Sequence, residues 1–340
     1  MDTQDREKYR QLRQQQRERQ LHIIRLSILL GVGVILMFTG LGLLTYVHQQ
    51  KQTATSGNVS ERFSEAASSA ALETASRNDL DTETAAATEK AQKKKKKQSQ
   101  TTDVSETTPV SADDYLGLLQ QQSADLPKLK RILKDPSRYP KSLLKALSKN
   151  SEMLDFVLDY PKKHKNAAAK SIGDDFVTGE IPALIQWDER WGYAPYGTGI
   201  VATSGCGPTC MAMVAAGLNQ DASITPAKVA AYGTEHGYVD EENNTYWRFM
   251  DEAGANWNLN SVGGMLSEEQ VSAELAQGHP VICSMGPGNF TQIGHFIVLT
   301  GYENGTVTVN DPFSIKNTNT AWTFANIKDQ IKAMWTFSKK

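Results

Sequence analysis

The first strong pattern along the chain is an uncharged apolar run at residues 26–47. As a helix rising about 1.5 Å per residue, this run spans roughly the hydrocarbon core of a bilayer. Seven Lys and Arg residues precede it, whereas the first dozen positions after it contain only Lys51. The positive-inside rule therefore predicts a single-pass cell-membrane protein, with residues 1–25 as a basic cytoplasmic tail and everything from about residue 48 outside the cell.

Two other interpretations of this run are a cleaved signal peptide and a buried helix of a soluble core. The run is longer than the usual apolar part of a signal peptide, and no small-residue cleavage site follows it. It is apolar on all sides and includes glycines at positions 31, 33, 40 and 42, which suits lipid better than a soluble core. The sequence therefore favours a transmembrane anchor.

The apolar pattern stops after the anchor and returns in a different form. Residues 48–111 consist mainly of Ala, Ser, Thr, Glu and Gln with a lysine run at 93–97, which predicts a disordered stalk. The lysine run is typical of a solvated charged segment, although it could also contact anionic wall polymer or lipid. Over residues 112–175 apolar positions recur at helical spacing, and we expect two or three short helices punctuated by prolines 127, 136, 140 and 161. Asn150-Ser151-Glu152 is a plausible cap before the last helix, and this helical region either packs on the next domain or separates it from the stalk.

Strand-like patterns dominate the last part of the chain, residues 178–338. Alternating or β-branched stretches occur at 280–283, 295–300 and 306–309, and a helical stretch follows Cys206 over residues 211–216. These elements predict an α+β domain that contains a cysteine-bearing helix.

Composition removes several classes of function. The chain has 36 Lys and Arg against 38 Asp and Glu, a net charge of -2, so nucleic acid is not an expected partner. Its three cysteines are too few for a disulfide scaffold and lack paired zinc-binding spacing. We therefore expect no metal and no cofactor. We expect Cys210 and Cys283 to be core residues, with a disulfide between them as the alternative.

Cys206 is the first candidate for chemistry. It lies in Gly205-Cys206-Gly207-Pro208, immediately before the helical stretch, and Pro208 suits a first helical turn. A thiol at a helix N-terminus feels the positive end of the helix dipole, which favours the nucleophilic thiolate. The flanking glycines allow backbone or substrate to approach the sulfur closely. The alternative is a small buried residue at a helix start.

A nucleophilic cysteine needs a base, and His295 is the best placed of the histidines in this domain. It opens an apolar strand, which then turns and returns towards Asp311. A four-residue loop at 302–305 would put Asp311 within about one position of lying opposite His295, whereas a two-residue loop would displace the pair by roughly three residues. His279 reads as a turn residue ahead of a strand.

Four segments occur in an order that resembles a known family. They are Gln186-Trp187-Asp188-Glu189-Arg190-Trp191-Gly192, Gly205-Cys206-Gly207-Pro208-Thr209, Gly294-His295 and Asn310-Asp311-Pro312. This combination is similar to the bacteriocin-processing-peptidase-like cysteine peptidases, family thirty-nine. The resemblance implies a papain-like fold, in which the helix that carries the cysteine packs on an antiparallel sheet. It also implies Cys206 as nucleophile, His295 as general base and Asp311 as the residue that orients it. It further implies that Gln186 donates to the oxyanion hole, although Gln186 precedes Cys206 by a longer interval than in papain, and its alternative role is structural. Trp187, Gly205 and Gly294 are the residues we expect to border bound substrate.

These observations predict a membrane-anchored extracellular cysteine peptidase that hydrolyses amide bonds. The processing enzymes of this type act in the cytoplasm, so the predicted topology points instead to secreted peptides or bacterial cell-wall peptides as substrate. Two alternatives use the same cleft: an inactive module that binds wall peptides or a protein partner, and an acyl or peptidyl transferase.

Overall fold

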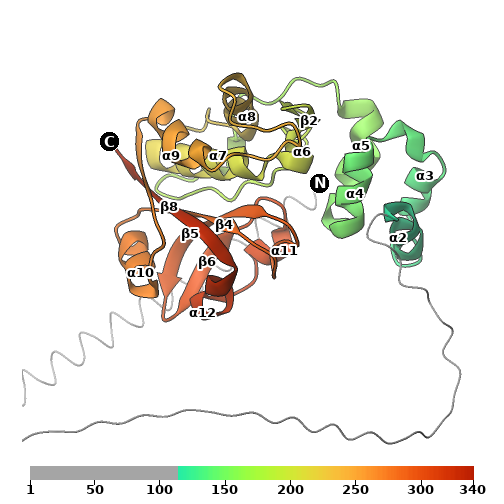
Figure 1. The fold of residues 1–340 in the computed structure, drawn as a ribbon. Coiled ribbons are helices and arrows are strands. Elements are labelled where there is room, and N and C mark those ends of the chain that lie inside the picture. The colour runs from blue at the N-terminus through green and yellow to red at the C-terminus, as the bar shows by residue number, and fades with distance from the viewer. Residues whose placement is uncertain (1–113) are drawn as a thin grey trace, which may run out of the picture. The chain divides into compact units, whose positions relative to one another are not determined.

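The computed structural model describes residues 114–340, which belong to one compact unit (Figure 1). The predicted tail, transmembrane helix and stalk lie outside the described residues. Within residues 114–340, no helix combines the length and apolar character that a membrane crossing requires.

Four short helices form the N-terminal part of this unit, one more than the upper number expected. They are α2 (Tyr115–Gln122), α3 (Leu129–Leu133), α4 (Lys141–Lys149) and α5 (Leu154–Lys163). The predicted cap is confirmed, because the Asn150 side chain accepts a hydrogen bond from the Glu152 N–H at the start of the short 3-10 turn η2 (Ser151–Met153). Pro161 does not separate helices as expected and lies inside the last turns of α5.

The apolar faces of these helices share a core with the following domain. Leu143, Leu147 and Phe156 pack in one buried cluster with Trp187 and Tyr193. The ring of Tyr193 stacks on Phe156 at 4.2 Å between centroids, and its hydroxyl donates to the Phe156 carbonyl at 2.8 Å. The helical region is therefore packed on the next domain.

The domain that follows the helical region contains a six-stranded sheet. Its strands lie in the order β3-β8-β4-β5-β6-β7, and each neighbouring pair is antiparallel. The strands are β3 (Leu259–Gly263), β4 (Val281–Met285), β5 (His295–Glu303), β6 (Thr306–Asn310), β7 (Trp322–Thr323) and β8 (Ile331–Lys339). The three predicted strands are confirmed as β4, β5 and β6. The central strand β8 was not predicted.

Helices cover both faces of this sheet (Figure 1). One face packs on α7 (Cys206–Asn219), which is followed by α8 (Pro226–Glu235) and α9 (Arg248–Glu252). The other face packs on α10 (Glu268–Ala276) and α12 (Phe324–Ile327), while the short α11 (Ile315–Thr318) lies beside β6. The expected mixed helix and sheet fold is confirmed.

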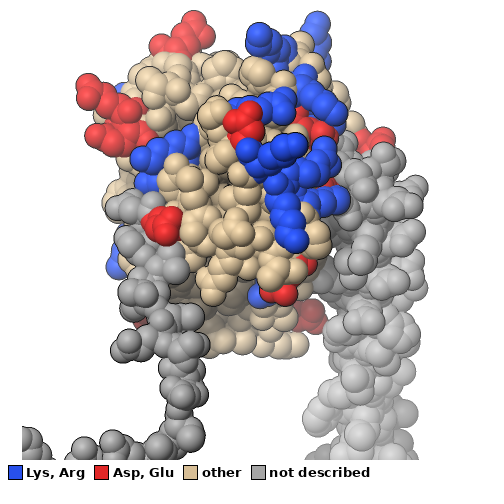
Figure 2. All heavy atoms as spheres, turned by 90° about the vertical axis from the view of Figure 1, so that its right-hand side faces the viewer, with Lys and Arg blue, Asp and Glu red and all other residues tan. Residues whose placement is uncertain are grey.

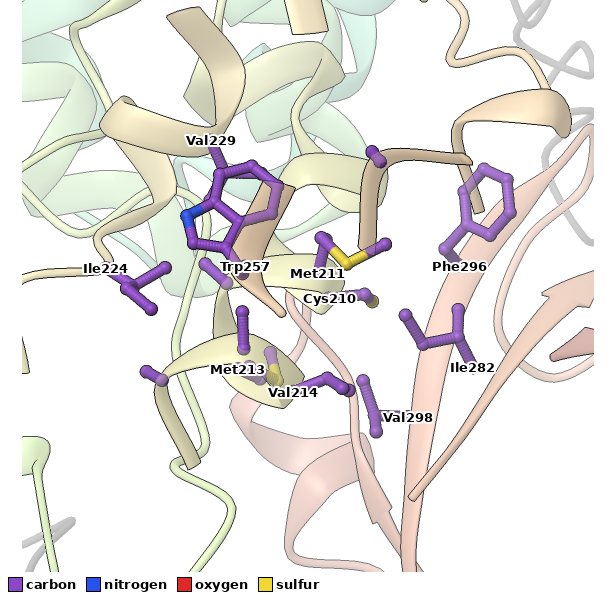
Figure 3. Packing of buried hydrophobic residues seen from close by; sticks show 14 of the residues in the cluster. Cys210, Met211, Met213, Val214, Ile224, Val229, Trp257, Ile282, Phe296 and Val298 are labelled. Carbon is purple, nitrogen blue, oxygen red and sulfur yellow. The ribbon is translucent and has the colours of Figure 1, made fainter. Parts of the chain in front are cut away.

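Helix α7 is buried over residues 207–217, which explains why its sequence lacks a polar face. Cys210 and Val214 pack towards Ile282 of β4 and Val298 of β5 (Figure 3). This packing holds the helix rigidly against the sheet and so fixes where its first residue, Cys206, stands.

The two parts of the unit carry opposite charge. Residues 114–170 contain twelve Lys and Arg against six Asp and Glu, whereas residues 171–340 contain eight against eighteen. Figure 2 shows basic side chains gathered on the side of the molecule that the helical region forms. The small net charge of the whole chain therefore conceals a basic helical region and an acidic sheet-containing domain.

Candidate active site

Cys206 is the first residue of α7, as predicted, and Gly205 is its N-cap. A separate short helix, α6 (Val201–Ser204), ends just before it, so the backbone turns sharply at Gly205. A Cβ on Gly205 would lie 2.6 Å from the Val201 carbonyl oxygen, and one on Gly207 would lie 2.6 Å from Thr245 Oγ1. Both glycines are therefore required by the packing of the chain around the sulfur.

The structure brings His295 and Asp311 together beside Cys206. The Nε2 atom of His295 lies 2.7 Å from Asp311 Oδ1, and the two side chains are 8% and 1% exposed. This contact leaves Nδ1 as the ring nitrogen that can serve the Cys206 thiol, and hydrogen bonding to His295 is one cause of the lowered pKa of that thiol. The three groups form a continuous chain from carboxylate to imidazole to sulfur.

The hairpin that aligns His295 with Asp311 uses a two-residue turn in place of the four-residue loop considered above. Asn304 and Gly305 both have positive φ angles, 49° and 81°, and Glu303 pairs with Thr306. An irregularity between Leu299 and Gly301 then shifts the register by one residue, so Asn310 pairs with Val298.

That register shift decides which face the carboxylate occupies. Directly opposed residues of an antiparallel pair share a face, so Asp311, one residue beyond the Asn310–Val298 pair, falls on the same face as Ile297 and His295. Without the extra residue in β5, Asp311 would fall on the opposite face. The bulge thus corrects a misalignment that the tight turn alone would produce.

The carboxylate of Asp311 accepts three further hydrogen bonds. Its Oδ1 accepts from the Phe313 N–H at 2.8 Å and the Ser314 N–H at 3.2 Å, and its Oδ2 accepts from Asn317 Nδ2 at 2.8 Å. Asn317 is not among the site residues predicted from the sequence. The available signal was the segment Asp311-Pro312-Phe313-Ser314, which is typical of an Asx turn in which the carboxylate caps the backbone two residues on.

The electrostatics of the site favour a charged sulfur. Burial by itself raises the pKa of the Cys206 thiol, but the hydrogen bond and positive charge of His295, with N–H groups of Phe296 and Gly207, bring that pKa below its ordinary value. Burial lowers the pKa of His295, whereas the charge and hydrogen bond of Asp311 and the contact with Cys206 raise it to about 10. These interactions therefore favour the thiolate form of Cys206 and the imidazolium form of His295.

The other two cysteines have the opposite environment. Cys210 and Cys283 are free, buried thiols, so the alternative of a disulfide between them is not present in the structure. Burial raises the pKa of both thiols well above the ordinary value. Among the three sulfurs only Cys206 is activated.

Gln186 lies in the wall of the site. Its side chain is 2% exposed, and Nε2 donates one hydrogen bond to the Ala202 carbonyl of α6 at 2.9 Å. Its backbone N–H donates to the Pro312 carbonyl at 2.7 Å, which ties it to the residue after Asp311. The Oε1 atom is buried without a hydrogen-bond partner.

The three residues expected to border substrate have different surroundings. Trp187 is 1% exposed, and its indole N–H donates to the Phe313 carbonyl at 2.8 Å. It is therefore a core residue, and we no longer assign it a contact with substrate. Gly205 is packed against α6 as described. Gly294 precedes His295 with open space where a Cβ would stand. His279 lies in the turn after α10, where its Nδ1 contacts Glu274 at 2.9 Å, away from this site.

Part of the chain is similar to known proteins. The sequence model of the Peptidase_C39 like family matches residues 178–340. The solved structures that are similar to part of the chain include two bacterial proteins. The peptidase domain of Streptococcus ComA, a bi-functional ABC transporter involved in quorum sensing, is 18% identical, with 41% of this chain and 93% of that chain covered and a TM-score of 0.32. A protein from Bacillus anthracis described as a C39-like peptidase is 16% identical, with 48% and 98% covered and a TM-score of 0.32.

No curated protein matches the sequence. The family match covers the whole segment that carries Gln186, Cys206, His295 and Asp311. Residues 178–340 therefore carry a domain that matches the Peptidase_C39 like family, as the order of the four motifs predicted.

Proposed function

We propose that the protein is a cysteine peptidase that hydrolyses amide bonds through Cys206, His295 and Asp311. One observation carries the proposal: the buried hydrogen-bonded chain from Asp311 through His295 to a sulfur at a helix N-terminus. A thiolate held beside an imidazolium is the reactive form that nucleophilic catalysis requires. The domain family supports the same chemistry.

The reaction follows from the placement of these groups. The Cys206 thiolate attacks the amide carbonyl carbon to form a C–S bond, and His295 gives its proton to the leaving nitrogen as the C–N bond breaks. Water then attacks the resulting thioester while His295 takes up one proton of that water. The C–S bond breaks, the product acid leaves and the ion pair is restored. Asp311 stays charged throughout and orients the imidazole.

The oxyanion formed in each attack needs hydrogen-bond donors. The Cys206 N–H at the start of α7 is one, because the first N–H groups of a helix have no partner within it. The second is Gln186, whose amide nitrogen carries one hydrogen beyond that given to Ala202. The backbone link from Gln186 to Pro312 holds this amide in register with the His295–Asp311 pair.

The proposed substrate depends on location. The apolar run at 26–47 and the basic residues before it support a domain held outside the cell on a stalk. Secreted peptides or the peptide crosslinks of a bacterial cell wall are then the substrates within reach.

The test compares the wild-type chain with a Cys206→Ala variant. We expect iodoacetamide to alkylate wild-type Cys206 near neutral pH far faster than Cys210 or Cys283, whose raised pKa values keep them as buried thiols. We expect the wild type alone to cleave members of a peptide library or purified wall material, as read by mass spectrometry.

Equal cleavage by both chains would refute the assignment. No excess alkylation at Cys206 would refute the peptidase and leave a binding module. Products joined to an added amine acceptor, in place of hydrolysed products, would replace hydrolysis with transfer.

A further inference from the structure

The position of the Asp311 carboxylate depends on the residues that follow it. Apart from His295, its three hydrogen-bond donors are the N–H groups of Phe313 and Ser314 and the Asn317 side chain. The phenyl ring of Phe313 also lies edge-on to the imidazole of His295, 6.3 Å between centroids. Any movement of residues 313–317 would therefore displace the Asp311 carboxylate and alter the packing of the His295 imidazole.

The helical region, which precedes the peptidase domain in the chain, makes hydrogen bonds to residues 313–316. Asn150 Nδ2 donates to the Phe313 carbonyl at 2.6 Å. The two carboxylate oxygens of Glu152 accept separately from the N–H groups of Ile315 and Lys316, each at 2.9 Å. We call Asn150 and Glu152 the clamp. It contacts the segment on both sides of Ser314, so it restrains both ends of the turn that cradles Asp311.

The clamp is itself anchored. Asn150 Oδ1 accepts from the Glu152 N–H at 3.0 Å, so the two side chains belong to one hydrogen-bonded turn. That turn runs directly into Met153 and Leu154, which are buried in the core shared with the peptidase domain. The Phe313 carbonyl accepts from Trp187 as well as from Asn150. The clamp therefore joins the helical core, the Gln186-Trp187 segment and the Asp311 loop at one point.

We propose that Asn150 and Glu152 are positioning residues of the active site, and that the helical region is part of the catalytic apparatus because of them. This inference rests on the proposed peptidase function. The clamp touches neither substrate nor reacting atoms. It acts by holding residues 313–317 in place, and these residues position the Asp311 carboxylate. Asp311 then stabilises the proton on His295, and His295 stabilises the charge on Cys206.

The test uses the whole chain carrying Glu152→Ala and measures the rate of Cys206 alkylation by iodoacetamide as a function of pH. If Asp311 is released, the pKa of His295 falls and that of Cys206 rises, because each charge supports the next. The thiolate limb of the profile should then move to higher pH, and at a fixed pH below the limb the rate should fall about tenfold for each unit of movement. With a cleaved peptide, kcat should fall while KM changes little.

Glu152→Gln tests the same contact with little change in size. The amide retains one acceptor oxygen, so it can serve one of the two N–H groups, and we expect a shift between those of the wild type and Glu152→Ala. Asp155→Ala is the matched control, because its carboxylate pairs with Lys128 in the same helical region, 2.8 Å away. It should leave the profile at its wild-type position.

The outcomes separate this inference from the function on which it rests. A wild-type profile in folded Glu152→Ala would overturn the positioning role and leave the peptidase intact. A uniform fall in rate at all pH values, with the limb unmoved, would also overturn it, since that result indicates lost folded protein. A wild-type Cys206 without enhanced reactivity would instead refute the proposed function.

Discussion

At the scale of single residues, the site depends on cysteine thiols whose pKa values are shifted in opposite directions by their surroundings. Three cysteines lie within one domain, yet burial raises the pKa of Cys210 and Cys283 while His295 lowers that of Cys206. The difference comes from one imidazolium, and the imidazolium is stabilised by one buried carboxylate. Asp311 is therefore the residue whose charge should control the pH dependence of the reaction.

Replacing Asp311 with Asn tests this dependence. In the wild type the rate should rise as Cys206 loses its proton and fall as His295 loses its own, with the alkaline limb near the raised His295 pKa of about 10. Without the carboxylate charge the His295 pKa falls, so the alkaline limb should move to lower pH and kcat/KM should drop roughly 100-fold. The pH profile of kcat/KM checks this. Asp221→Asn, which removes an exposed carboxylate that accepts from the Ser223 N–H, should leave the profile unchanged.

The residues of this site differ in how far the sequence predicts them. Cys206, His295 and Asp311 each occupy a recognisable local context: a helix start, a strand start and a strand end. Asn317 is found only through the Asx turn that precedes it. The local sequence marks Asn150 and Glu152 as part of a helix cap, but nothing in it shows that they meet partners more than 160 positions away. Trp187 lies beside Gln186 in sequence, but burial assigns it to the core.

At the scale of elements, the site depends on close packing at the start of α7. Gly207 faces Thr245, whose hydroxyl hydrogen-bonds Tyr196 at 2.7 Å. The segment that carries Thr245 therefore lies directly against the turn that presents the nucleophile.

Gly207→Ala should destabilise the protein by about 1–3 kcal/mol, because the added Cβ would lie 2.6–2.9 Å from atoms of the Thr245 side chain. It should also lower kcat by displacing Cys206. In a Gly207→Ala/Thr245→Ala double mutant part of this loss should be recovered, since the Oγ1 and Cγ2 atoms at 2.6 and 2.8 Å are removed while the Cβ at 2.9 Å remains. Urea unfolding of the two single mutants and the double mutant measures the coupling. Strictly additive losses would show that the two residues do not constrain each other.

The elements themselves were predictable to different degrees. Strands β4, β5 and β6 have β-branched or alternating stretches, and α7 begins where its glycines and Pro208 indicate. Strand β8 lies between β3 and β4 and is covered on both faces over much of its length, so its sequence shows no simple alternation. The bulge in β5 could not be anticipated, because it depends on how that strand fits its neighbour.

At the scale of the whole molecule, the helical region and the peptidase domain share a core. Phe156 is fully buried, stacks on Tyr193 and lies so close to Gly192 that a Cβ there would meet its ring at 2.8 Å. The two parts should therefore unfold together.

Phe156→Ala tests this cooperation and should cost about 3–5 kcal/mol, because it removes a large buried ring. All six tryptophans lie in residues 187–335 and only Trp187 belongs to the core shared with the helical region, so tryptophan fluorescence reports mainly on the peptidase domain. We expect the fluorescence transition to shift as far as the helix signal in circular dichroism. Leu116→Ala, at a partly exposed position of α2, should shift both far less. An unmoved fluorescence transition in Phe156→Ala would mean that the parts unfold independently.

The burial of Cys210 and Cys283 has a consequence for how the protein responds to oxidants. Peroxides react with accessible thiolates, and protonated thiols inside a core are poor targets. Oxidative damage to cysteine should therefore concentrate on the nucleophile and leave the interior sulfurs intact. Inactivation by mild oxidation would then be reversible by thiol reductants as long as Cys206 has gone no further than sulfenic acid, because the scaffold around it carries no second sulfur available for scrambling.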